Sequence, residues 1–329
     1  MWLFIMAALV LGMVVLGGAT RLTDSGLSIT EWRPVSGALP PLNEAAWAAE
    51  FAKYKLIPQF SELNPTMTLS EFRFIYWWEW SHRQLGRLVG VAFIVPFIFF
   101  LARRMIPRRL IWRCFALLLL GGLQGLVGWW MVYSGLSGRV SVAPERLMVH
   151  LSLALVLFGA LIWNGLEAEA GKGRGVAAGP FARVGLALTV LIFLQAMLGA
   201  LVAANDAGKT LTDWPLMGGD IFPEHYWKGD LWQTLVHNAP SVQFHHRMVA
   251  YLLFILMTAF MASAANSRII QPTVRSGAFA LGGLAIIQVV LGVVTLWMVA
   301  PLGLSIAHQI VATLLLGVAV WFTWRARRL

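Results

Sequence analysis

Long apolar segments separated by short charged ones are the main constraint on the fold of this sequence. Of the 329 residues, 59% are hydrophobic and only 12% are charged. A helix rises about 1.5 Å per residue, so about 20 apolar residues span a hydrocarbon layer of roughly 30 Å. Eight segments have this length, at residues 2–18, 68–103, 115–133, 146–163, 184–204, 244–264, 277–299 and 304–324. We therefore predict an all-α integral membrane protein with eight transmembrane helices.

The first apolar segment, residues 2–18, admits two interpretations. It has the length of a signal peptide, but no basic residue precedes it, and the sequence that follows it recurs later in the chain. We interpret it as the first transmembrane helix and expect little of the protein to precede it.

Basic residues collect in the short segments between the predicted helices. Five arginines lie near the turn between the second and third helices: Arg103, Arg104, Arg108, Arg109 and Arg113. Since short arginine-rich loops stay on the cytoplasmic side, we expect both termini there and the long segments 20–74 and 205–243 outside. These loops also account for the net charge of +10, so nucleic acid is not an expected partner. The single cysteine, Cys114, excludes an intrachain disulfide and a cysteine-rich metal site.

The chain contains an internal repeat. Residues 17–26 align without gaps with residues 199–208, and the glutamine-to-glycine segment 124–128 aligns with 288–292. The second alignment also pairs the two His-Arg steps of the chain, at 82–83 and at 246–247. The repeat predicts two tandem, pseudo-symmetric four-helix bundles, which have the same orientation because each crosses the membrane an even number of times.

The division between the two predicted units falls in a segment of small residues. Residues 167–179, EAEAGKGRGVAAG, have the composition of a flexible linker. We predict an N-terminal unit at 1–168, a linker at 169–182 and a C-terminal unit at 183–329.

Four histidines occupy matched positions in this repeat, near the outer ends of the even-numbered predicted helices: His82, His150, His246 and His308. Each unit thus holds two imidazoles on separate helices. A four-helix bundle can hold a flat cofactor between its helices, and haem iron takes axial histidine ligands. A single histidine in a transmembrane helix is also compatible with a packed, hydrogen-bonded residue, but four at matched positions favour ligation of haem iron. Zinc is less favoured, because its sites need three or four protein ligands together.

One carboxylate breaks the symmetry between the two units. Glu79 lies one helical turn before His82 and shares a face with it, whereas the aligned position before the second His-Arg step is Gln243. A carboxylate beside a bound cofactor can accept a proton, orient a water or stabilise positive charge, and glutamine cannot do the proton transfer. We predict a catalytic Glu79. The alternative is an interfacial acid paired with Arg83 or Arg73.

The arginine of each His-Arg step is a candidate for contact with the cofactor. Arg83 and Arg247 lie at the depth where haem propionates would emerge, and charge-assisted pairing is expected there; the alternative is interfacial snorkelling. His245 aligns with Ser81, and a helix cannot direct both His245 and His246 at one iron. We therefore take His246 as the ligand.

Four motifs of this chain closely resemble those of the haem A synthase family. They are VLGGATRLTDSGLSITEWRPVSGALPP (15–41), EFRFIYWWEWSHRQLGRLVG (71–90), VQFHHRMVAYLL (242–253) and SIAHQIVATLLLG (305–317). They are spread from residue 15 to residue 317, so the resemblance extends over nearly the whole chain. The resemblance implies eight transmembrane helices in two pseudo-symmetric halves. It also implies an oxidoreductase that converts the C8 methyl group of haem O to a formyl group, giving haem A for terminal oxidases.

The same resemblance implies roles for individual residues. His82 and His150 would hold the substrate haem, with Glu79 as the acid needed for catalysis. His246 and His308 would ligate a haem b for electron transfer. Some family members carry a cysteine pair in the first outer loop; residues 20–74 contain no cysteine, so this chain resembles the cysteine-less branch.

The resemblance also implies partners and a location. We expect haem O as substrate, a haem O synthase and an electron-transfer protein as partners, and a homo-oligomer as one possible assembly. The expected location is a bacterial inner membrane, with the mitochondrial inner membrane less favoured. Two other functions stay open from the residues alone: a di-haem b-type electron-transfer protein and a haem transporter or chaperone.

Overall fold

The computed structural model describes residues 1–171, 179–267 and 270–329. Across these ranges, eight helices are long and apolar enough to cross a membrane. They are α1 (Trp2–Leu22), α4 (Leu69–Ala102), α5 (Arg108–Leu136), α6 (Pro144–Ala170), α7 (Pro180–Ala204), α9 (Ala239–Asn266), α10 (Pro272–Trp297) and α11 (Leu302–Ala326). The prediction of an all-α membrane protein with eight transmembrane helices is confirmed.

Most of these helices extend beyond the predicted apolar segments. The third begins at Arg108 rather than at 115, and the fourth continues past Trp163 to Ala170. The extra turns include charged residues such as Arg108 and Glu169, which suit the interface between hydrocarbon and water, where a helix continues although its residues are no longer all apolar. Thr68 and Glu71 form a capping box at the start of α4.

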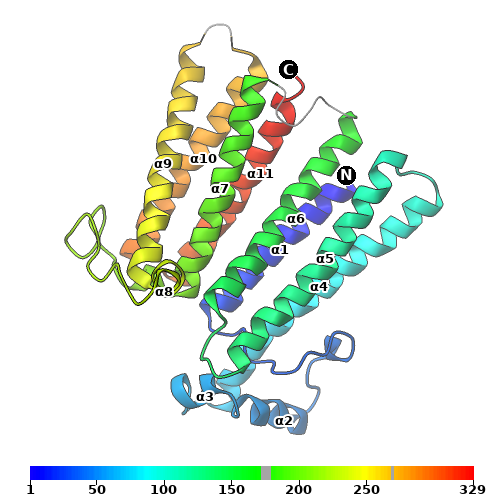
Figure 1. Cartoon of the computed structure of the whole chain (residues 1–329). Coiled ribbons are helices and arrows are strands. Elements are labelled where there is room, and N and C mark those ends of the chain that lie inside the picture. The colour runs from blue at the N-terminus through cyan, green and yellow to red at the C-terminus, as the bar shows by residue number, and fades with distance from the viewer. Residues whose placement is uncertain (172–178, 268–269) are drawn as a thin grey trace.

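The long helices form two groups of four (Figure 1). Helices α1, α4, α5 and α6 contact one another, as do α7, α9, α10 and α11. Helices α6 and α1 of the first group contact α7 and α11 of the second. The domain boundaries at 168 and 183 stay a prediction, and residues 172–178 of the predicted linker lie outside the described residues.

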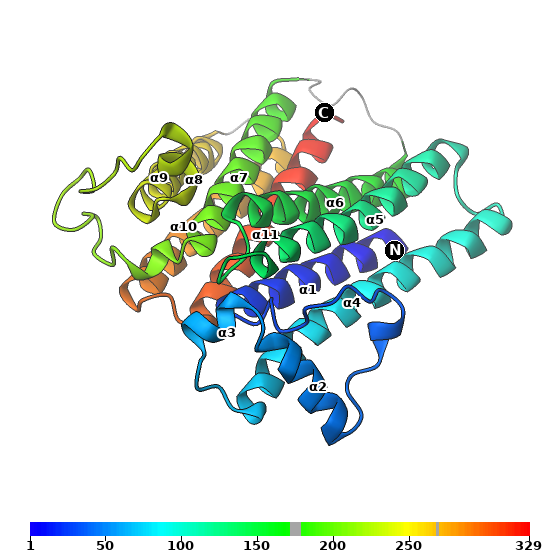
Figure 2. The same ribbon diagram turned by 60° about the horizontal axis from the view of Figure 1, so that its bottom comes forward.

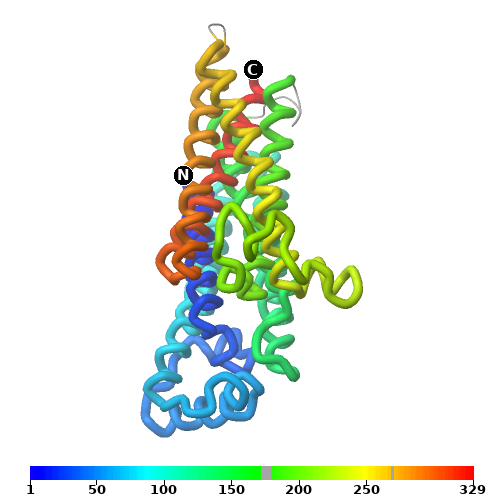
Figure 3. Tube along the Cα trace, turned by 90° about the vertical axis from the view of Figure 1, so that its left-hand side faces the viewer, coloured from blue at the N-terminus to red at the C-terminus, as the bar shows by residue number. Residues whose placement is uncertain are grey.

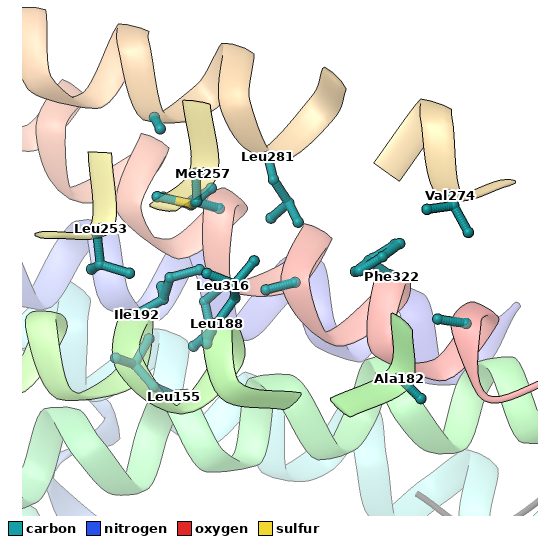
Figure 4. Packing of buried hydrophobic residues seen from close by; sticks show 14 residues of the cluster. Leu155, Ala182, Leu188, Ile192, Leu253, Met257, Val274, Leu281, Leu316 and Phe322 are labelled. Atoms are coloured by element: carbon teal, nitrogen blue, oxygen red, sulfur yellow. The ribbon is translucent and has the colours of Figure 1, made fainter. Parts of the chain in front are cut away.

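The largest apolar cluster crosses from one group to the other. It joins Leu188 and Ile192 of α7 and Leu316 of α11 with Leu155 of α6 (Figure 4). Because lipid is as apolar as these side chains, close packing rather than exclusion of water holds such helices together. Gly277 of α10 is an example, since a Cβ there would collide with the ring of Phe322.

The two long polar segments contain the remaining short helices. The first holds η1 (Ser36–Ala38), α2 (Glu44–Tyr54) and α3 (Pro58–Leu63), and the second holds η2 (Ala207–Lys209) and α8 (Leu231–His237). Figure 2 shows α2 and α3 beneath the first group, and Figure 3 shows both segments at the end of the molecule away from the C-terminus. Asn43 caps α2, which buries Trp47, Phe51 and Tyr54.

Candidate functional site

The histidine pair of the second group has the spacing of two ligands to one metal ion. His246 on α9 and His308 on α11 have ring centroids 6.5 Å apart. Bonds of about 2 Å from one metal ion to a nitrogen of each ring place two imidazole centres roughly 6 Å apart. The Nδ1 atom of His308 is buried and has no hydrogen-bond partner in the described part of the chain. Both observations fit two axial ligands of a haem iron.

A glycine faces the imidazole of each proposed ligand in the second group. A Cβ on Gly199 of α7 would lie 3.2 Å from Cε1 of His246, and one on Gly292 of α10 would lie 3.0 Å from Cε1 of His308. Contacts this short leave no room for a larger residue unless the ring moves. Each ring is thus held against the backbone of the neighbouring helix.

The first group repeats this arrangement. A Cβ on Gly17 of α1 would lie 3.0 Å from Nε2 of His82 on α4, and one on Gly128 of α5 would lie 2.9 Å from Cε1 of His150 on α6. All four histidines therefore lie in the same local setting, and each is only partly buried. A free imidazole packed by chance would not recur in this way on four helix pairs.

Glutamines support three of the histidines. Each donates from its side-chain amide to the backbone carbonyl of one histidine: Gln124 to His150 at 3.0 Å, Gln195 to His246 at 2.9 Å and Gln288 to His308 at 3.1 Å. These glutamines are not among the site residues predicted from the sequence. The glutamine-to-glycine spacing of 124–128 and 288–292 was a signal of duplication, but only the packing shows that these helices face the histidines.

Glu79 is 3% exposed and has donors on both carboxylate oxygens. Its Oε2 accepts from Ser28 Oγ and from the backbone N–H of Ile29, both at 2.8 Å, and its Oε1 accepts from Arg83 Nη2 at 2.6 Å. The ion pair with Arg83 that we considered as an alternative is therefore present, whereas Arg73 pairs with Glu44. Glu79 holds the outer segment onto α4, and its catalytic role stays a prediction.

Arg83 reinforces this attachment. Its guanidinium donates to the backbone carbonyls of Ile29 at 2.8 Å and Glu31 at 3.0 Å. These hydrogen bonds hold the first outer segment, residues 20–74, against α4. Contact between Arg83 and a haem propionate stays a prediction.

The second group has the same attachment with an amide in place of the acid. Buried Gln243 donates to the carbonyls of Ala207 at 2.8 Å and Leu211 at 3.1 Å, and Arg247 donates to those of Leu211 at 2.8 Å and Asp213 at 3.0 Å. Residues 211 and 213 are the counterparts of 29 and 31 in the alignment of the outer segments. The arginines of the two His-Arg steps thus bind equivalent carbonyls.

His245 points to a different environment from its neighbour. Its Nε2 lies 2.8 Å from the hydroxyl of Tyr226 in the second outer segment. This contact supports our choice of His246 as the ligand on α9.

The fold and the site define a class of protein: a multi-pass membrane protein with one histidine pair in each of two four-helix groups, suited to bind haem. Comparison with known proteins identifies the family. The family model described as cytochrome oxidase assembly protein matches residues 1–320. The chain belongs to this family.

Curated relatives extend over the whole chain. A protein named "Heme A synthase" from Caulobacter sp. (strain K31) is 55% identical over 328 residues, which cover 100% of this chain and 96% of that protein. Its namesakes from Caulobacter vibrioides and Maricaulis maris are 55% and 47% identical, and each alignment covers 99% of this chain and 95% of the relative. The resemblance stated from the motifs is confirmed.

Proposed function

We propose that this protein is a haem A synthase, which oxidises the C8 methyl group of haem O to a formyl group and supplies haem A for terminal oxidase assembly. The observation that carries the proposal is the similarity over the whole chain to proteins named "Heme A synthase". The two histidine pairs, of which only the first has a carboxylate one turn away, support it. The alternative of a di-haem electron carrier does not explain why one pair alone has an acid.

In this proposal the first group binds the substrate. His82 and His150 hold haem O between α4 and α6, with their rings against Gly17 and Gly128. The methyl group is oxidised in two steps through an alcohol. In the first step the methyl carbon gives up two electrons and one proton and gains a hydroxyl from water, which releases a second proton. In the second step the alcohol loses two electrons and two protons to give the aldehyde, and the electrons of both steps pass to the second group.

The proposed catalytic role of Glu79 is electrostatic. Its carboxylate lies one turn from His82, and its position is held by Ser28, Ile29 and Arg83. A fixed negative charge beside the first site stabilises positive charge that develops on the substrate and can orient the attacking water. Gln243 supplies no such charge in the second group.

The second group serves electron transfer in this proposal. Haem b, when bound to His246 and His308, supplies a redox centre whose potential depends on its axial ligands. The contact between α11 and α1 joins this group to the first. An electron-transfer protein of the membrane would take the electrons onward.

The proposed location is the bacterial inner membrane, with both termini in the cytoplasm and both outer segments on the opposite side. The arginine-rich turn that follows α4 supports this orientation. A haem O synthase in the same membrane would supply the substrate. A homo-oligomer is compatible with this arrangement.

The test is the haem content of cells that express this chain together with a haem O synthase, in a host without a haem A synthase of its own. Extracted haems are separated by chromatography and identified by mass. Haem A, which has one oxygen more and two hydrogens fewer than haem O, is expected only when this chain is present. A host that accumulates haem O alone would contradict the proposal.

A further inference from the structure

A local unit of three residues recurs around the proposed ligands. On α5, α7 and α10 a glutamine binds the backbone carbonyl of a histidine on the next helix, and a glycine one turn further on faces that histidine's ring. The three units are Gln124 and Gly128 with His150, Gln195 and Gly199 with His246, and Gln288 and Gly292 with His308.

Each glutamine amide also contacts the imidazole itself. The amide nitrogen of Gln195 lies 3.0 Å from Nδ1 of His246, that of Gln124 lies 3.3 Å from Nδ1 of His150, and that of Gln288 lies 3.2 Å from Nε2 of His308. One amide therefore reaches both the backbone and the ring of its histidine. It restricts the orientation of the ring before any cofactor is bound.

The amide oxygens complete this picture. The Oε1 atoms of Gln124, Gln195 and Gln288 are buried, and none has a hydrogen-bond partner within the described ranges. The contacts with each histidine are therefore made by the amide nitrogen of its glutamine and not by the amide oxygen.

The fourth position differs. In the alignment of residues 17–26 with 199–208, the residue one turn before Gly17 is Met13, where Gln195 stands one turn before Gly199. The methyl carbon of Met13 lies 3.6 Å from the position of a Cβ on Gly86, one turn after His82 on α4. Met13 thus reaches α4 at Gly86, one turn from His82, but a thioether donates no hydrogen bond and accepts only weakly.

The difference affects how strongly each histidine binds iron. A neighbouring group that fixes the orientation of a ligating histidine strengthens metal binding, and its loss typically lowers metal affinity about 10–100-fold. A glutamine amide orients His150, His246 and His308, and within the described ranges no side-chain amide contacts His82. The supported pair His246 and His308 suits a resident cofactor, whereas a site with one unsupported ligand suits a haem that enters and leaves.

We propose that Gln124, Gln195 and Gln288 are positioning residues for the axial histidines, and that Met13 makes His82 the ligand that releases the haem of the first group. This inference rests on the proposed function, which places haem O in the first group and haem b in the second. It assigns to the first group one firmly held ligand, His150, and one exchangeable ligand.

The test measures the rate at which the purified holoprotein loses each haem to an excess of apomyoglobin, with haem O or A and haem b distinguished by chromatography. Met13→Gln adds the missing amide, and we expect it to slow release of haem O or A about 10-fold or more while release of haem b is unchanged. Met13→Leu, which cannot hydrogen-bond, is the matched control and should release both haems at the wild-type rates. Equal rates in wild type and Met13→Gln would overturn the proposal.

The converse substitution tests the same idea in the second group and leaves the residues of the first group unchanged. Gln195→Met should speed release of haem b about 10-fold or more and shift its low-spin optical and electron paramagnetic resonance spectra. Unchanged haem b release and spectra would also overturn the proposal. Failure of the proposed function would be visible separately, as the absence of haem A from cells with the wild-type chain.

Discussion

The side-chain amide of Gln309 donates a hydrogen bond of 3.1 Å to the backbone carbonyl of Val14, and so joins α11 to α1 between the two groups of helices. Gln309 follows the proposed ligand His308, and Val14 lies less than one turn before Gly17, which faces His82. This hydrogen bond therefore connects backbone segments that touch the two histidine pairs.

Substitution of Gly18 tests this connection. The amide oxygen of Gln309 lies so close to Gly18 that a Cβ there would displace the amide and break its bond to Val14. Overpacking of this kind costs about 1–3 kcal/mol, so Gly18→Ala should lower the thermal unfolding temperature in detergent. Gly12→Ala on the same helix is the control, because its Cβ would meet only Leu85 at 3.9 Å. Equal unfolding temperatures for the two variants would contradict the expectation.

Substitution of a glycine that faces a histidine should lower the haem content of the protein. Gly292→Ala places a methyl group 3.0 Å from Cε1 of His308 and should tilt the ring, which lowers the haem b content of the purified protein. Gly283→Ala on the same helix α10 is the matched control, since its Cβ would meet nothing within 4 Å. Pyridine haemochrome spectra measure the haem content. A full complement of haem b in Gly292→Ala would speak against axial ligation by His308.

The catalytic role of Glu79 can be separated from its structural role. Glu79→Gln removes the charge that Arg83 binds, and breaking a buried ion pair costs about 3 kcal/mol of stability. We expect this variant to keep haem bound but to stop haem A production. Ser28→Ala removes only one hydrogen bond to the same carboxylate, at about 1 kcal/mol, and should retain most of the activity. Extracted haems identified by mass provide the measurement. Full haem A production in Glu79→Gln would refute a catalytic role, and equal losses in both variants would indicate a structural one.

An ion pair between the two groups of helices should make the stability of the protein depend on pH. Arg21 of α1 binds Asp206 at 2.8 Å, and Asp206 also binds Lys209 at 2.8 Å. Burial raises the pKa of Asp206, but the Arg21 charge and the hydrogen bonds from Lys209 and Arg21 outweigh it, so the net pKa is lowered. The stabilisation is therefore complete above the unfolded pKa of about 3.9 and is lost as the pH falls through the lower folded pKa.

Thermal unfolding of Asp206→Asn against pH provides the measurement. Asparagine also tolerates the positive φ of 50° at this position, so the variant changes the charge and not the backbone. Wild type should unfold at a higher temperature than Asp206→Asn at neutral pH, and the difference should shrink below a pH of about 4. A difference that is independent of pH would show that the Arg21 pair does not stabilise the protein.

Several features of the protein follow from short stretches of sequence. The eight transmembrane helices, the capping box at Thr68 and Glu71 and the cap at Asn43 were predictable, because apolar length and capping depend on neighbouring residues. The four histidines were predictable as a set, because duplication repeats their positions along the chain. The ends of the helices were less predictable, since the interface lets a helix continue through charged residues.

What a side chain meets on another helix depended on packing and could be known only from the tertiary structure. Arg83 and Arg247 were expected at the cofactor, and the structure shows their guanidinium groups on equivalent backbone carbonyls of the outer segments. The sequence by itself determined which residue types lie at which depth along each helix, because rise per residue and hydropathy are local properties. Only the tertiary structure decided which faces meet, because the rotation of one helix against the next depends on small residues such as Gly17 and Gly292 that allow the rings to approach.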